Sequence, residues 1–236
     1  HFGLTESLAF EFVDDLAKQI LAEVMMFRRV PASSDVCDNI ACQKCSAPHL
    51  PKIISAVKQN IPITFVLPAF PGKSPNPEKV LGPLPDHAER LSLNFLDNLC
   101  QRIKQLYTPG IKIILCSDGR VFSDVVGMRE QHVSAYQLEL ARLIEDMSLA
   151  DISTYNLDDC YGGLNFVQMR TELMKQCGQP VDALKEKVRN GTKPLATPEE
   201  QEANRMYRGI TRFLFEDAMY PGQTKSRTAI QKDARS

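Results

Sequence analysis

The chain has 236 residues, of which 43% are hydrophobic and 24% are charged, and its formal net charge is −1. This composition is that of an ordinary globular protein: no basic excess indicates nucleic-acid binding, and no apolar run approaches the roughly 18 residues of a membrane-spanning helix. Seven scattered cysteines, an odd number, and no visible signal peptide favour a cytoplasmic protein with free thiols over a secreted protein with a disulfide framework.

The first fifty residues are expected to form a helix followed by a loop that contains cysteines. Helical periodicity predicts a helix from Ser7 to Arg28, which Pro31 ends. The loop after it has the spacing C-x4-C-x2-C-x3-H, formed by Cys37, Cys42, Cys45 and His49. Three thiolates and an imidazole can close a tetrahedral, structural zinc site, and the alternative is that the cysteines are small buried hydrophobic residues.

From residue 51 to residue 236 the sequence predicts one α/β domain. Strands are expected at Ile63–Leu67, Ile111–Cys116 and Ile152–Leu157. Helices are expected at Lys52–Gln59, Glu89–Tyr107, Glu130–Met147, Phe166–Cys177, Val181–Arg189 and Thr197–Phe215. Strands that alternate with helices indicate a Rossmann-like, mostly parallel sheet with helices on both faces.

The loop after the first expected strand is rich in proline and in cations. Positions 68, 71, 75 and 77 are proline, which stiffens the backbone. Its candidate binding residues are Lys73, Ser74, Asn76 and Lys79. A stiff cationic loop at a strand end can hold an anion at low entropic cost, although the lysines can equally be solvated loop residues. His87, just beyond this loop, is a candidate base.

The second expected strand ends in a further polar segment, residues 117–124. The guanidinium of Arg120 can bind a carboxylate or a phosphate in bidentate fashion, and Asp118 and Asp124 can hold an ammonium group or accept protons. The alternative is a local turn with an ion pair. Because the carboxyl ends of parallel strands meet at one sheet edge, we expect these loops and Asp158, after the third strand, to share one site.

Four motifs resemble those of the isonitrile (isocyanide) synthase family, which also contains the pyoverdine and dityrosine biosynthesis proteins. They are LPAFPGKSPNPEKVLGPLPD (Leu67–Asp86), CSDGRVFSD (Cys116–Asp124), YNLDD (Tyr155–Asp159) and YRGITRFLFED (Tyr207–Asp217). The resemblance runs from about Cys37 to the last residue. Members of that family typically continue beyond the point where this chain stops, so the chain looks like a C-terminally shortened version.

The resemblance implies an enzyme of secondary metabolism that converts the amino group of an α-amino acid to an isonitrile, with ribulose 5-phosphate as carbon donor. No cofactor is then required for the chemistry. The implied substrate-binding residues are Lys73, Ser74, Asn76, Lys79, Arg120, Ser123, Asp158, Arg208 and Arg212. The implied proton carriers are Asp118, Asp124, His87 and Glu216. The expected partners are the two small-molecule substrates and a downstream oxygenase of the same pathway, without nucleic acid or membrane.

Two interpretations from other classes stay open. The first is a Rossmann-like transferase that uses a nucleoside cofactor, against which the missing glycine-rich turn after the first strand counts. The second is a non-catalytic binding module derived from the enzyme, which a shortened C-terminus allows.

Overall fold

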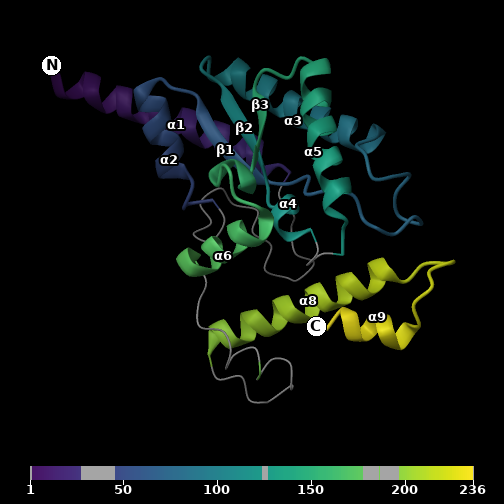
Figure 1. Ribbon diagram of the computed structural model, residues 1–236. Coiled ribbons are helices and arrows are strands. Elements are labelled where there is room, and N and C mark those ends of the chain that lie inside the picture. Colours follow the sequence, from purple (N-terminus) through teal and green to yellow (C-terminus); the bar gives the residue numbers. More distant parts are fainter. Residues whose placement is uncertain (1, 28–45, 124–126, 178–185, 187–196, 236) are drawn as a thin grey trace. The chain divides into compact units, whose positions relative to one another are not determined.

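The computed structural model describes residues 2–27, 46–123, 127–177, 186 and 197–235 (Figure 1). Its helices are α1 (Phe2–Met25), α2 (Leu50–Gln59), α3 (His87–Leu106), α4 (Gly119–Phe122), α5 (Glu130–Asp146), α6 (Phe166–Cys177), α8 (Pro198–Ala218) and α9 (Arg227–Asp233). Its strands are β1 (Ile63–Pro68), β2 (Ile111–Ser117) and β3 (Ile152–Asn156), and a 3-10 turn, η1 (Leu157–Cys160), follows β3. The chain forms two compact units, residues 1–68, 87–115 and 141–154 in unit 1 and residues 69–86, 116–140 and 155–236 in unit 2.

The three strands form one sheet in the order β1-β2-β3. The amide of Ile63 donates to the carbonyl of Gly110, and the amide of Ala69 donates to that of Cys116, six residues further along both segments. Because the pairing advances in the same direction on both strands, β1 and β2 are parallel. The predicted α/β class and the three predicted strands are therefore confirmed, whereas the Rossmann-like label stays a prediction.

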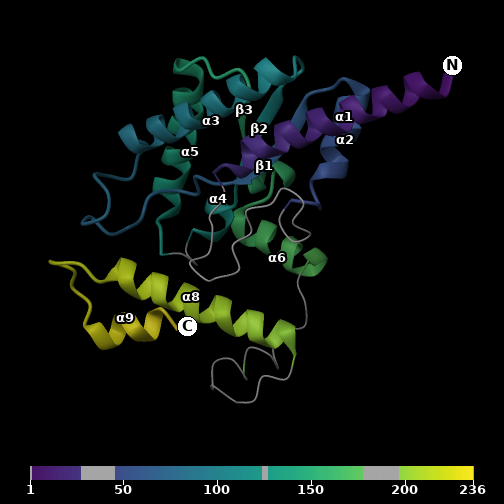
Figure 2. The ribbon, with the colours of Figure 1, turned by 180° about the vertical axis from the view of Figure 1, so that it is seen from behind.

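In unit 1, α1 packs against α2 and α3. Figures 1 and 2 show α1 and α2 side by side from opposite directions. The ring of Phe27, just after α1, meets Phe95 of α3 edge-on with centroids 4.6 Å apart. Arg102 of α3 pairs with Glu23 of α1 at 3.1 Å. The helix before residue 50 thus packs on elements after it, and the expected domain boundary near residue 50 stays a prediction.

The inner face of α3 contains Cys100, whose side chain is only 1% exposed. Burial raises the pKa of this thiol from its ordinary value of 9.0 to about 12, and the nearby carboxylates of Asp151 and Asp97 add to the shift. The thiol therefore stays protonated in the folded protein at any pH below about 12.

We expect Cys100 to escape alkylation in native protein near neutral pH and to react fully once the protein is unfolded. Cys177, which is exposed, is the internal control and should react in both states. The unfolded thiol ionises from about pH 9.0 and the folded one near 12, so the stability that this group contributes is present below pH 9.0 and is lost between the two values. Peptide mapping by mass spectrometry measures the labelling. Equal labelling of both cysteines in native protein would contradict this expectation.

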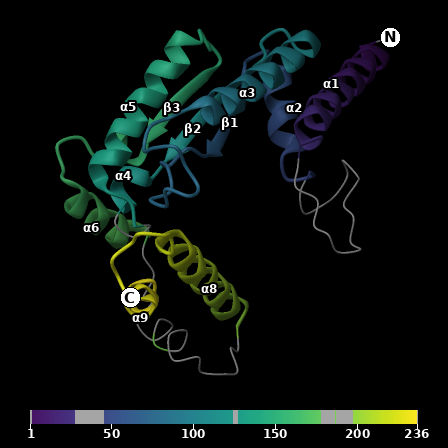
Figure 3. The ribbon, with the colours of Figure 1, turned by 90° about the vertical axis from the view of Figure 1, so that its right-hand side faces the viewer.

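In unit 2, helix α8 begins as its sequence predicts. The side chain of Thr197 accepts a hydrogen bond from the amide of Glu200 at 3.2 Å, and Pro198 occupies the first helical position. The polar segment after α8 folds back as α9, which lies beside α8 (Figure 3). There Arg227 stacks on the ring of Phe215, 5.3 Å from its centroid. Sequence reasoning did not predict α9.

Among the described residues, no helix combines the length and the apolar character that a membrane crossing requires.

Candidate functional site

The proline-rich loop, residues 69–86, is fixed to the C-terminal end of α8 by a buried carboxylate. Asp217 is 2% exposed and accepts hydrogen bonds from two residues of the loop. The hydroxyl of Ser74 donates to one of its oxygens at 2.9 Å, and the ammonium of Lys79 donates to the other. Since Ser74 has one proton to give, its hydroxyl cannot also donate to a ligand in this arrangement.

Asn76 extends the same connection. Its side chain is buried, and its amide group donates to the carbonyls of Glu216 and Met219 at 3.4 Å each. Its carbonyl oxygen accepts the amide of Glu78 at 2.9 Å. We call the group Ser74, Asn76, Lys79 and Asp217 the loop clasp. Three predicted substrate-binding residues therefore have structural partners here, and their roles in binding stay predictions.

The loops after β1 and β2 touch at Gly119. A side chain on this residue would bring its Cβ within 2.1 Å of the carbonyl oxygen of Pro71, which no side chain can tolerate. Gln137 of α5 holds the same region by donating to the carbonyl of Phe70 at 2.6 Å and to the hydroxyl of Ser117 at 3.1 Å. Glycine is thus required at position 119 because two strand ends converge there.

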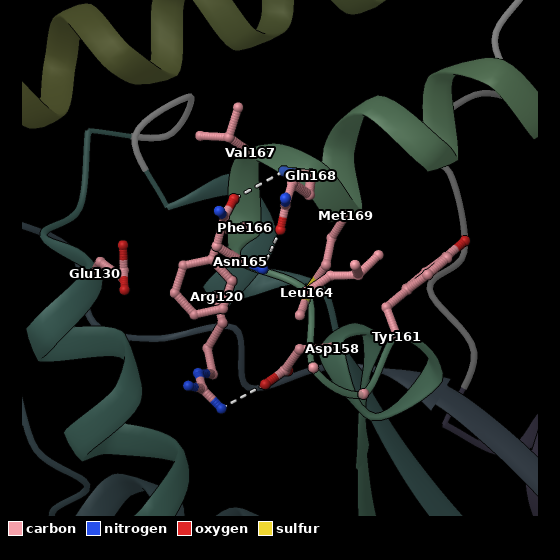
Figure 4. Close-up of a pocket in the computed structure, with 12 residues that line it drawn as sticks. Arg120, Glu130, Asp158, Tyr161, Leu164, Asn165, Phe166, Val167, Gln168 and Met169 are labelled. Carbon is pink, nitrogen blue, oxygen red and sulfur yellow. Dashed lines mark hydrogen bonds and ion pairs between the residues drawn. The ribbon is translucent and has the colours of Figure 1, made fainter.

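Arg120 and Asp158 line the first of two cavities, which has a volume of about 620 Å³ (Figure 4). The two side chains form an ion pair between the end of β2 and the end of β3. The guanidinium also lies over the ring of Phe166, 5.1 Å from its centroid. The topology argument predicted that these two strand ends would lie together, and the structure brings them into contact.

The ion pair leaves two buried polar atoms without a partner in the described part of the chain. The side chain of Asp158 is 10% exposed, and its second oxygen has no hydrogen-bond partner among the described residues. The same holds for Nε of Arg120. Figure 4 shows the carboxylate of Glu130, the first residue of α5, on the same cavity. A guanidinium and two carboxylates can together bind a zwitterion, and the carboxylates can carry protons.

The remaining wall of this cavity is mostly apolar. Besides Phe166 it includes Tyr161, Leu164, Val167 and Met169. Val167 is 73% exposed, an unusual state for a large apolar side chain beside a cavity. This wall can hold the apolar part of a ligand, and we call this site the arginine cavity.

A second cavity, also of about 620 Å³, lies between the proline-rich loop and the segment before α5. Four basic residues line it: Lys73, Arg129, His132 and Lys225. Of the predicted binding residues, Lys73 and Ser74 are in this cavity, while Arg120 and Asp158 are in the arginine cavity. The single predicted site is therefore two cavities.

The other predicted site residues line neither of these two cavities. Asp118 is exposed at the start of α4, and Ser123 is buried at its end. Arg212 and Glu216 pair with each other at 2.7 Å on an exposed face of α8, where Arg208 is also exposed. His87 is the exposed first residue of α3. Their catalytic and binding roles stay predictions.

Some predictions fall on residues outside the described part of the chain. Asp124 is one, and Cys37, Cys42 and Cys45 of the expected zinc site are others. The expected helix Val181–Arg189 also lies outside the described residues, apart from residue 186. The fourth expected ligand, His49, is exposed next to the start of α2. No cluster of metal-ligating side chains occurs among the described residues, so the zinc site stays a prediction.

Sequence reasoning missed four residues that line the cavities: Glu130, Phe166, Arg129 and His132. Glu130 and Phe166 served only to mark the starts of expected helices. For Arg129 and His132 the sequence held a signal: they lie where a helix begins after the end of a strand of the sheet, which is a common place for a binding site.

Comparisons with known proteins agree on one family. The model of the pyoverdine/dityrosine biosynthesis protein family matches residues 53–236. The L-tryptophan isonitrile synthase AmbI1 of Fischerella ambigua is 39% identical over 223 residues, which are 94% of this chain and 67% of that protein. An L-tyrosine isonitrile synthase of Pseudomonas aeruginosa is 42% identical over 230 residues, with the same two coverages.

The crystal structure of the PvcA protein from Pseudomonas aeruginosa is similar to this fold, with a TM-score of 0.80 and 42% sequence identity. The match covers 93% of this chain and 69% of that one. The chain thus spans about two thirds of the length of the relatives that it matches.

Proposed function

The chain belongs to the pyoverdine/dityrosine biosynthesis protein family, and from this membership we propose that it acts as an isonitrile synthase. It would convert the amino group of an α-amino acid to an isonitrile, with ribulose 5-phosphate as the carbon donor. The observation that carries the proposal is the arginine cavity, where a guanidinium, two carboxylates and an apolar wall lie on one cavity of about 620 Å³.

The arginine cavity has a group for each part of an amino acid. The N–H groups of Arg120 that do not face Asp158 can bind the carboxylate of the substrate. The free oxygen of Asp158 and the carboxylate of Glu130 can accept the ammonium protons. The wall formed by Tyr161, Leu164, Phe166 and Val167 suits an aromatic side chain. Relatives named for L-tryptophan and L-tyrosine support an aromatic amino acid as the substrate.

The chemistry asks for proton carriers next to the amine. The amine nitrogen would attack the ketone carbon C2 of the sugar, and the ketone oxygen would leave as water with the two protons that the amine loses. For C2 to become the terminal carbon of the isonitrile, its bonds to C1 and to C3 must then break. Release of C1 as formaldehyde, of phosphate from C5 and of C3–C5 as a three-carbon hydroxyketone balances the atoms and electrons without an oxidant. Asp158 and Glu130 are placed on the cavity that would hold the nitrogen, so we assign them the proton transfers.

We expect the full-length protein to transfer carbon from the sugar to the amino acid. Incubation of L-tyrosine or L-tryptophan with ribulose 5-phosphate labelled with ¹³C at C2 should give an isonitrile that carries the label, detected by mass spectrometry. Sugar labelled at C1 is the matched control and should leave the isonitrile unlabelled. If no proteinogenic amino acid yields labelled product, the proposed function is wrong. In a thermal-shift assay, a higher unfolding temperature with a nucleoside cofactor would instead favour the transferase. No rise with either ribulose 5-phosphate or the nucleoside cofactor would favour the binding module.

A further inference from the structure

The second cavity has the charge of an anion site. Among the residues that the structure describes, its lining includes Lys73, Arg129, His132 and Lys225 and no aspartate or glutamate. Lys73 pairs with Asp86 at 3.1 Å and Lys225 pairs with Asp233 at 2.6 Å, so the excess positive charge on the cavity comes mainly from Arg129 and His132. We call this site the basic cavity.

Lys73 is the least exposed of the four basic residues of the basic cavity. Its side chain is only 10% exposed, and its ammonium lies 3.1 Å from a carboxylate oxygen of Asp86. A charge so far removed from water interacts strongly with a further anion, because little solvent screens it. Asp86 pairs with this ammonium but does not itself line the cavity.

Arg129 and His132 carry donors that no described carboxylate pairs with. Both are exposed, and neither has an ion-pair partner among the residues that the structure describes. They lie at the start of α5, a helix of 17 residues, where the positive end of the helix dipole favours an anion, while the amides of His132 and Val133 already donate to the carbonyl of Arg129. Two cationic side chains and the positive end of a helix therefore border the same cavity.

The opposite wall is rigid. It is formed by the proline-rich loop, including Pro75, Pro77 and Pro83, and the loop clasp ties this loop to α8. A wall that is already fixed loses little conformational entropy when a ligand binds. The basic cavity is thus preorganised as well as positively charged.

We propose that the basic cavity binds the phosphate group of a phosphorylated sugar, with Lys73, Arg129 and His132 as the phosphate ligands. This inference rests on the proposed function for the identity of the sugar, and on the cavity alone for the phosphate. Glu130 lines the arginine cavity, and Arg129 and His132 line the basic cavity, so both cavities border the first turn of α5. In ribulose 5-phosphate the ketone carbon is three carbon–carbon bonds from C5, so the sugar chain can run from the phosphate toward the amine.

Titration calorimetry on the full-length protein tests the site. The ligands are ribulose 5-phosphate, inorganic phosphate and unphosphorylated ribulose. Arg129→Met and Lys73→Met should each weaken binding of both phosphate compounds by about ten- to a hundredfold, since each removes a charge-assisted hydrogen bond. Neither variant should change the binding of ribulose. Lys175→Met is the matched control, because this exposed lysine pairs with Glu172 in its own helix and lines neither cavity, and its affinities should equal those of the parent.

The outcomes separate the site from the proposed function. Loss of phosphate affinity in Arg129→Met supports the site even if no isonitrile is ever formed. An unchanged affinity for inorganic phosphate in Arg129→Met and in His132→Ala overturns the site, even if the parent protein makes isonitrile. Arg129 and His132 are exposed, so their variants should keep the parent's unfolding temperature, which shows that lost binding is not lost folding.

Discussion

Replacing Arg120 by methionine should reduce kcat/KM for the amino acid by about a hundred- to a thousandfold. The change removes the charge-assisted hydrogen bonds to the substrate carboxylate, which are worth about 1.5–3 kcal/mol each, or roughly a tenfold to a hundredfold in rate or affinity. It also leaves Asp158, which is 10% exposed, without its cation. Steady-state kinetics on the full-length protein measure the effect. Arg205→Met, at a position 77% exposed on α8, should leave kcat/KM unchanged.

A double variant separates a role in binding from a role in folding. Arg120→Met combined with Asp158→Asn removes both charges, so it should unfold at a higher temperature than Arg120→Met alone. If Arg120 binds the substrate carboxylate, the double variant still binds 3-(4-hydroxyphenyl)propanoate weakly although stability returns; this analogue has no amine and so does not need Asp158. Recovery of that affinity together with stability would show that Arg120 only compensates Asp158.

Replacing Lys79 by methionine should destabilise the protein by about 3 kcal/mol, more than replacing its partner. The variant leaves Asp217, 2% exposed, as a buried carboxylate without a cation, and uncompensated buried charges are strongly unfavourable. Asp217→Asn instead leaves Lys79, which is 45% exposed and can be solvated, so we expect a loss of only about 1 kcal/mol. Urea unfolding measures both values.

The order of the two losses is the decisive result. Lys175→Met, at an exposed pair within α6, is the control and should change the free energy of unfolding by less than about 0.5 kcal/mol. If Asp217→Asn is the more damaging change, the hydrogen bond from Ser74 rather than the ion pair holds the loop clasp together.

The sequence predicts elements well where a local pattern marks both ends. Strand β2 is an apolar run between Gly110 and a polar turn, and its predicted bounds differ from the observed ones by one residue. The proximity of the strand ends that carry Arg120 and Asp158 followed from topology, because parallel strands end at one edge, whereas the ion pair between them was not predicted. By contrast, α9 has only seven residues, too few for a clear helical periodicity.

The candidate site was harder to predict because its contacts join distant segments. Ser74 and Asp217 are 143 residues apart, and no local sequence pattern predicts that the hydroxyl of a loop residue donates to a carboxylate at the end of a distant helix. For the same reason the sequence did not separate Lys73 from Arg120, which line different cavities. Residue types and strand ends were visible in the sequence, whereas the division of the polar groups between two cavities required the packing.

The two units are interleaved along the chain, which passes from one to the other after residues 68, 86, 115, 140 and 154. During synthesis, unit 1 cannot be complete until residue 154 has left the ribosome, and by then two segments of unit 2 have already emerged without the rest of theirs. Neither unit corresponds to a contiguous stretch of the gene. A single crossover with a relative between residues 69 and 154 would therefore divide both units between two parents, so over this stretch the two units are inherited together.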